Sequence, residues 1–120
     1  MPEIKLPDSE IKVMDFLWEK GKASAKETAQ YMGEAYGWKK NTTYTVLSNL
    51  HEKGVLNRSE PGFICSPLID RAQVGKVEAE TLLKKFYKGS PAALFAAFLD
   101  EKSISDEELD EIKKMIDQFK

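Results

Sequence analysis

The segment from Trp38 to Gly54 constrains the fold of this 120-residue chain most strongly, because its apolar and polar residues separate at helical spacing. Apolar residues at positions 46, 47 and 50 fall on one face of a helix expected over residues 40–53. The opposite face carries a lysine, amides and hydroxyls: Lys40, Asn41, Thr42, Thr45, Ser48 and Asn49. Such side chains bond phosphates and base edges, so the pattern favours a helix that enters the major groove of DNA.

Two shorter helices are expected before this segment. The first begins at a cap on Asp8 or Ser9 and closes at Gly21. Ser24 and Glu27 form a capping box that opens the second, which we expect to end near Met32. For the third helix Asn41 is the best local cap. Residues 55–60 and 63–67 resemble two short strands around a Pro-Gly turn. Together these elements predict a winged helix-turn-helix domain of three helices and a two-stranded wing in residues 1–69.

Residues 70–120 predict three more helices. Asp70 caps a long one to about Tyr87, Ser90-Pro91 starts the next, and Ser105 opens the last. Residues 92–99 are apolar almost all round, and such a helix must be buried on every side. Because about 50 residues cannot bury it alone, we expect a twofold homodimer. The expected interface residues are Leu82, Leu83, Phe86, Leu94, Phe95, Phe98, Leu99, Ile112 and Ile116. The expected fold class is therefore mainly α, with an N-terminal winged helix and a C-terminal helical dimerisation region.

The charge of the chain is unevenly distributed. The formal net charge is −2, but four basic residues and one acidic residue between positions 39 and 58 give that segment +3. Positive charge is thus concentrated where phosphates would lie, and its modest size predicts modest affinity per protomer. The residues expected to position the protein on phosphates are Lys39, Lys40, Lys53 and Arg58.

The remaining chemistry is sparse. Cys65 is the only cysteine, which excludes an internal disulfide and a cysteine-rich metal site and favours a reducing cytosol. His51 is the only histidine and has no recognisable catalytic partner. No signal peptide or membrane-spanning run is present in the sequence. We therefore expect a cytoplasmic protein that is not an enzyme and needs no metal or cofactor.

Several motifs in order resemble the penicillinase-repressor (BlaI/MecI) family, nearly end to end. The matching stretches are residues 8–18, 38–47, 52–56, 66–69 and 86–90. The resemblance implies a small cytoplasmic homodimer that binds a palindromic operator and represses genes for antibiotic resistance or copper handling. Thr42 and Thr45 match threonines of the family's recognition helix, and Lys40 and Asn41 lie at its start.

The chain departs from the family pattern on its DNA-facing side. Asn49 stands where many members carry arginine. The wing is shorter than usual, lacks a basic residue near its tip and carries Glu60, which would repel phosphate. Arg58 and Lys53 are the nearest substitutes for the missing cation.

The resemblance also bears on induction. In antibiotic-responsive members a membrane sensor protease signals, and the repressor is cut before a phenylalanine of the dimerisation region. The matching bond here is Ala97–Phe98, with alanine where those members have asparagine. Phe98 also fits as dimer core, and both roles are compatible. The cysteine cluster that ends the copper-responsive members is absent, so soft-metal sensing is not expected.

Two other functions are compatible with the sequence. A winged helix can act as a protein–protein adaptor, which an acidic pI of about 5.5 would suit. A small-molecule sensor between the dimer helices would need a cavity there. Tyr44 fits equally well against DNA or against the second helix.

Overall fold

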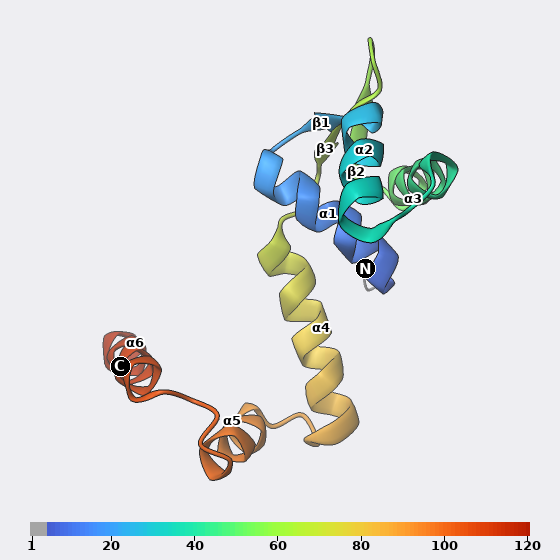
Figure 1. Ribbon diagram of the computed structural model, residues 1–120. Helices are drawn as coiled ribbons and strands as arrows, with labels where there is room; N and C mark the ends of the chain where they lie inside the picture. Colours follow the sequence, from blue (N-terminus) through green and yellow to red (C-terminus); the bar gives the residue numbers. More distant parts are fainter. Residues whose placement is uncertain (1–4) are drawn as a thin grey trace. The chain divides into compact units, whose positions relative to one another are not determined.

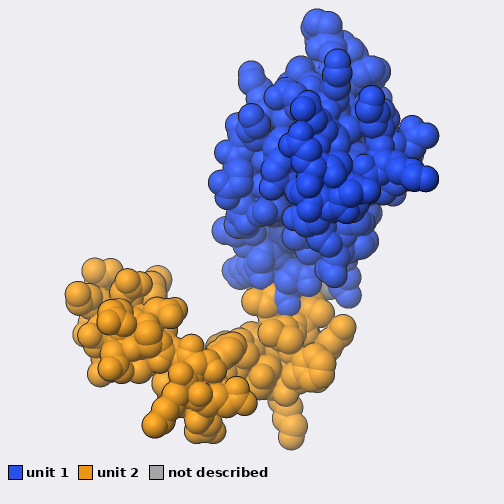
Figure 2. All heavy atoms as spheres, viewed as in Figure 1, with its two compact units in different colours: residues 1–78 blue, residues 79–120 orange. Residues whose placement is uncertain are grey.

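The computed structural model describes residues 5–120, and the described part of the chain is mainly helical (Figure 1). Its elements, in chain order, are α1 (Asp8–Lys20), β1 (Ala23–Ser24), α2 (Ala25–Tyr36), α3 (Lys40–Glu52), β2 (Leu56–Ser59), β3 (Ile64–Pro67), α4 (Arg71–Phe86), α5 (Pro91–Asp100) and α6 (Asp106–Phe119). The chain divides into two compact units, residues up to 78 and residues 79–120, and the division falls inside α4 (Figure 2).

The core of the first unit lies among its three N-terminal helices and its small sheet. Val13, Met14 and Leu17 of α1 meet Met32 of α2 and Leu50 of α3, and all five are fully buried. Each such side chain contributes about 1.5–3 kcal/mol relative to leaving it in water. This packing fixes which face of α3 turns inward, and therefore which face remains in solvent.

The sheet has three antiparallel strands in the order β1-β3-β2, whereas the sequence predicted two. Residue Cys65 of β3 pairs with Arg58 on one side and with Ala23 on the other. The two-residue strand β1 could not be expected from sequence, because two residues show no alternation and only β3 gives them a partner. The pairing of β1 with β3 connects the wing to the start of α2, where the Ala25 N–H donates to the Phe63 carbonyl at 3.0 Å. The turn between β2 and β3 projects from the unit (Figure 1).

Three helix boundaries differ from the predicted ones. Helix α1 begins at Asp8 with Pro7 as its cap residue and no side-chain cap bond, so neither Asp8 nor Ser9 caps it. Helix α2 continues through Gly33 to Tyr36 and ends at Gly37, whose φ of 73° lies in the left-handed region. The end of α2 follows from this glycine, because the Gly37 N–H donates to the Gly33 carbonyl at 3.0 Å and the Trp38 N–H to the Met32 carbonyl at 3.4 Å. Helix α3 begins at Lys40, with Lys39 as a cap residue that makes no side-chain bond, so Asn41 is not the cap.

The capping box at the start of α2 is confirmed. The Glu27 N–H donates to the Ser24 hydroxyl at 3.0 Å, and the Ser24 N–H donates to the Glu27 carboxylate at 3.1 Å. The bond from the Ser24 N–H to the carboxylate, and after it one from the Ser24 side chain, hold the pKa of Glu27 below its usual value. The start of α2 is thereby fixed beside the wing.

The first turns of α4 belong to the first unit. Asp70 caps the helix as predicted, because its carboxylate accepts from the Gln73 N–H at 2.9 Å while its own N–H donates to Gln73 Oε1 at 2.8 Å. Val74 is buried in the winged-helix core, and the Trp18 indole donates to the Ile69 carbonyl at 2.9 Å.

Charged contacts add to this attachment. The guanidinium of Arg71 pairs with Asp15 and with Glu19, the latter at 3.2 Å, and lies 5.2 Å from the Trp18 ring centre. Exposed ion pairs contribute little singly, so the apolar contact and the indole bond carry most of the attachment.

The second unit comprises the end of α4 and the helices α5 and α6. The Ser90 hydroxyl accepts from the Ala93 N–H at 3.1 Å, and the Ser105 hydroxyl accepts from the Glu108 N–H at 3.2 Å, so both predicted caps are confirmed. No residue of α5 or α6 is buried. Local capping signals start these helices, but their apolar residues remain partly or fully exposed in the single chain.

Candidate nucleic-acid interface

Helix α3 presents a polar face to solvent. Thr43, Val46, Leu47 and Leu50 are buried, and their spacing turns the other side of the helix outward. The predicted site residues on that side are all exposed: Lys39, Lys40, Asn41, Thr42, Thr45, Ser48 and Asn49. The structure thus brings together, on one exposed helix, hydroxyls and amides that can read base edges and two lysines that can meet phosphates.

The N-terminus of α3 is electrostatically positive. Its first turn contains no acidic residue, and the cap position makes no side-chain bond, which leaves backbone N–H groups open to a ligand. Lys39 and Lys40 stand at this same end. A helix terminus of this kind suits a phosphate, because N–H groups and the helix dipole both favour negative charge.

The structure gives Lys53 a partner that the sequence did not reveal. Its ammonium lies 2.5 Å from the carboxylate of Glu10 in α1 and donates to the Lys5 carbonyl at 3.4 Å. Glu10 is only 5% exposed, so its charge needs this partner. We therefore treat Lys53 as a residue that fixes the end of α3 against α1, and leave it out of the DNA contacts proposed below.

The wing contributes one exposed cation. Arg58 of β2 is exposed, and its guanidinium lies 5.3 Å from the ring centre of Phe63, the residue just before β3. Glu60, also exposed, lies between them in the turn. Positive charge on the wing therefore lies on strand β2, close to the turn, whereas the turn itself carries Glu60 and no cation.

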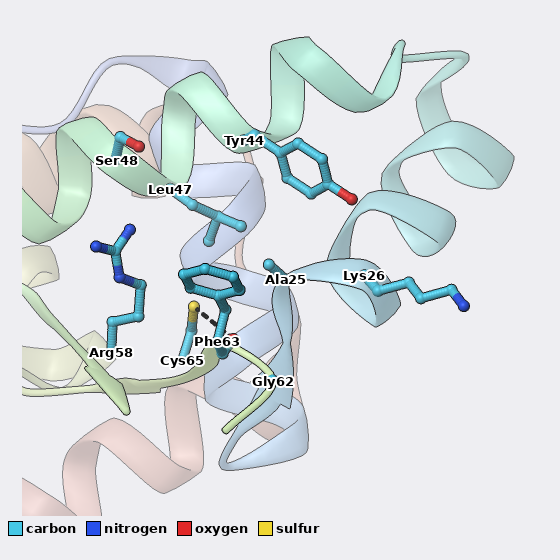
Figure 3. A pocket seen from close by; sticks show the side chains of 9 residues that line it. All are labelled: Ala25, Lys26, Tyr44, Leu47, Ser48, Arg58, Gly62, Phe63 and Cys65. Atoms are coloured by element: carbon cyan, nitrogen blue, oxygen red, sulfur yellow. Dashed lines mark hydrogen bonds between the residues drawn. The ribbon is translucent and has the colours of Figure 1, made fainter. Parts of the chain in front are cut away.

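The positions of two residues, one on α3 and one close to it, could not be predicted from the sequence. Lys26 is exposed in the first turn of α2, and Tyr44 is exposed on α3. Tyr44, Lys26, Ser48 and Arg58 all line one pocket, of about 360 Å³, between these helices and the wing (Figure 3). No local signal could have found it, because its walls come from segments that only the fold brings together.

An apolar surface lies on the second unit. Of the predicted dimerisation residues, the exposed ones are Leu82, Phe86, Phe98, Leu99 and Ile116, and the partly exposed ones are Leu83, Leu94, Phe95 and Ile112. Phe86 at the end of α4 is 71% exposed, and Phe119 at the end of α6 is 94% exposed. Exposed apolar surface on this scale marks an interaction site on a soluble protein.

Other kinds of site find no support in residues 5–120. No group of three or more histidine, cysteine, aspartate or glutamate residues there is placed to hold a metal ion. No helix in the same residues is long and apolar enough to cross a membrane.

Comparison with known sequences gives one consistent family. A sequence model described as penicillinase repressor matches residues 6–118. The penicillinase repressor of Bacillus licheniformis is 27% identical over 118 residues, which cover 97% of this chain and 92% of that protein. The methicillin resistance regulatory protein MecI of Staphylococcus aureus (strain N315) is 22% identical over 116 residues, which cover 95% and 94%.

Solved structures agree with the sequences. The solution structure of the DNA-binding domain of the repressor BlaI superposes with a TM-score of 0.56 and 27% identity, covering 60% of this chain and 90% of that one. The monomeric form of Bacillus licheniformis BlaI in complex with the blaP half-operator gives a TM-score of 0.53 at the same identity and coverage. The family match spans almost every residue, and the fold of the described N-terminal region agrees with it, so this chain belongs to the penicillinase repressor family.

Proposed function

We propose that this protein is a transcriptional repressor that binds operator DNA through α3. The observation that carries the proposal is the exposed polar face of α3, with its positive N-terminus, on a fold shared with the BlaI DNA-binding domain. A relative of the same fold is known in complex with a half-operator. Repression follows from occupancy, because a protein on the operator competes with RNA polymerase in the cytoplasm.

In this proposal the exposed residues of α3 have two tasks. Asn41, Thr42, Thr45 and Asn49 contact base edges in the major groove, with Ser48 alongside them. The cations Lys39, Lys40 and Arg58 contact phosphates, which position the helix but carry no sequence information.

We further propose that two copies associate through residues 70–120. The apolar surface of α5 and α6 is uncovered in the single chain, and a second copy would cover it. Twofold symmetry would then place two α3 helices in successive major grooves, about 34–36 Å apart on a palindromic operator.

Induction is proposed to act on that same association. A membrane sensor protease system, as in antibiotic response, would lead to cleavage of the Ala97–Phe98 bond within α5. Cutting there divides the most apolar helix of the second unit, so the dimer and its hold on DNA would be lost. Incubation with extracts of antibiotic-treated cells, followed by mass mapping of fragments, tests this step. A chain that stays intact under every inducer would contradict it.

DNA binding is tested by fluorescence anisotropy over a range of salt concentrations. We expect salt-sensitive association even with random duplex, which a protein–protein adaptor would not show. Lys40→Gln should weaken binding to every sequence. It should also reduce the salt slope, the steepness with which log K falls with log salt concentration, by about one. Thr45→Val should cost about 1–3 kcal/mol on the operator and nothing on random duplex.

A matched control is available on α4. Lys76 is exposed and lies outside the proposed DNA interface, so Lys76→Gln should leave both the DNA affinity and its salt dependence unchanged. A Lys40→Gln variant with wild-type salt dependence would contradict the assignment of Lys40 to phosphate.

A further inference from the structure

The pocket beside α3 lies wholly within the first unit. It measures about 360 Å³, is open to solvent on one side and is bordered by the start of α2, the middle of α3 and the wing. Figure 3 shows the Phe63 ring under Leu47, with Arg58 and Tyr44 on opposite sides of that ring. A space of this size accommodates a small ring compound, which is the lower end of the range for ligand sites.

The walls of the pocket are mainly apolar. Leu47 and Cys65 are buried and Ala25 is partly buried, whereas Phe63 is 50% exposed and offers its ring to the space. Phe63 has a φ of 52°, a conformation that costs energy for a residue with a bulky side chain. Its carbonyl, which accepts from the Ala25 N–H at 3.0 Å, fixes the backbone in that position. The backbone is thus held beside the pocket, and the ring lies next to the Arg58 guanidinium, 5.3 Å from the ring centre, with surface left for stacking.

The charge on the walls is of one sign. Lys26 and Arg58 line the pocket, and none of its lining residues is acidic. Burial raises the pKa of the Cys65 thiol, against a smaller lowering by Arg58, so this thiol adds no negative charge near neutral pH. Figure 3 shows the Lys26 side chain extending away from the Phe63 ring, which leaves Arg58 as the cation next to it. A ring stacked on Phe63 would therefore carry an anionic substituent toward a guanidinium, which pairs with carboxylates through two parallel hydrogen bonds.

We propose that this pocket binds a small aromatic carboxylate, with its ring against Leu47 and Phe63 and its carboxylate on Arg58. Ligand binding also weakens DNA binding, since Arg58 and Ser48 belong both to the pocket and to the proposed DNA interface. The first statement stands on the pocket alone, whereas the second rests on the proposed function. The proposed ligand site is on the DNA-binding unit, and not between dimer helices.

The first experiment is an NMR titration of the full-length, ¹⁵N-labelled protein with 2-naphthoate, in the absence of DNA. We expect saturable shifts at the amides of Leu47, Arg58 and Phe63, with a Kd of about 1 mM or tighter. The neutral analogue 2-naphthamide should bind at least about 10-fold more weakly, because it lacks the charge that Arg58 recognises. Equal affinities for the two compounds, or shifts confined to residues 79–120, would overturn the proposal.

Variants separate the two halves of the site. Arg58→Gln should weaken 2-naphthoate about 10-fold and leave 2-naphthamide unchanged, whereas Lys76→Gln should change neither. Ala25→Met narrows the apolar space without altering charge and should weaken both compounds. An unchanged amide spectrum away from the pocket verifies that each variant is folded. An Arg58→Gln protein that binds 2-naphthoate as well as wild type would contradict the assignment.

The second experiment measures competition by anisotropy with labelled random duplex at low salt. At about nine times its Kd, 2-naphthoate should raise the apparent Kd for DNA about 10-fold, and an equal concentration of acetate controls for ionic strength. Naphthoate that binds without changing the affinity for DNA would overturn the competition. A chain that binds no duplex would contradict the proposed function, while the NMR titration would still decide whether the pocket binds its ligand.

Discussion

The two units of this chain differ in where their apolar side chains lie. In the first, residues such as Met14, Leu17 and Leu50 are fully buried against one another. In the second, no residue of α5 or α6 is buried, although α5 is apolar over almost its whole length. Both units contain well-capped helices, so local signals alone do not explain the difference. The winged helix buries its apolar core within one chain, whereas the helices α5 and α6 do not, and the proposed second copy would supply the missing surface.

The largest expected effect is on the core of the first unit. Leu17→Ala should lower the free energy of unfolding by about 2–5 kcal/mol, since a buried leucine leaves a cavity. The same truncation at Leu82, which is exposed, should change the stability of the winged helix by less than about 0.5 kcal/mol. Urea denaturation followed by Trp18 and Trp38 fluorescence measures both. Equal losses at the two positions would remove the contrast between the units.

The next effect falls on the second unit. Phe98→Glu should weaken self-association by about 100-fold, or about 3 kcal/mol, because a charge would be buried without a partner. The control Lys113→Glu changes an exposed polar position of α6 and should alter association far less. Sedimentation velocity over a dilution series measures the self-association constant, and amide NMR spectra should show an intact winged helix. Association that survives Phe98→Glu unchanged would place the interface elsewhere.

A smaller effect distinguishes structural from DNA-binding lysines. Lys53→Met should lower the free energy of unfolding by about 2 kcal/mol or more, because it leaves the buried Glu10 carboxylate unpaired. Its salt slope for DNA should remain that of the wild type, in contrast to Lys40→Gln. Urea denaturation and salt-dependent anisotropy are the two measurements. A slope that falls by about one with Lys53→Met would return this lysine to the phosphate contacts.

The smallest expected effect is a gain in stability. The Thr43 hydroxyl is fully buried and has no hydrogen-bond partner among the described residues. Thr43→Val keeps a similar shape and removes the unpaired group, so it should raise the free energy of unfolding by about 1 kcal/mol. DNA affinity should not change, because this side chain faces the core. A loss of stability in thermal unfolding would show that the hydroxyl has a partner.

Periodicity and caps predicted much of this fold, since they are properties of neighbouring residues. The inner face of α3 around Val46 and Leu50 follows from 3.6-residue spacing, and the caps at Ser24 and Asp70 follow from residues three positions apart. The two faces of α3, and with them the candidate DNA contacts, were therefore accessible from the sequence.

Features that depend on distant residues could not be predicted in this way. The Glu10–Lys53 pair joins residues 43 positions apart, and β1 exists only because β3 lies beside it. The pocket requires Phe63 to reach the side of α3, which the turn of the wing decides. Sequence patterns are informative about which face of a helix is polar, but not about which cation on that face already has a partner.

Sedimentation equilibrium of the full-length protein at micromolar concentration tests the central contrast most directly. The account predicts a species of twice the 13.6 kDa chain mass, because a second copy covers the apolar helices of the second unit. A single species of 13.6 kDa at every concentration would contradict it, since those helices would then remain uncovered in solution.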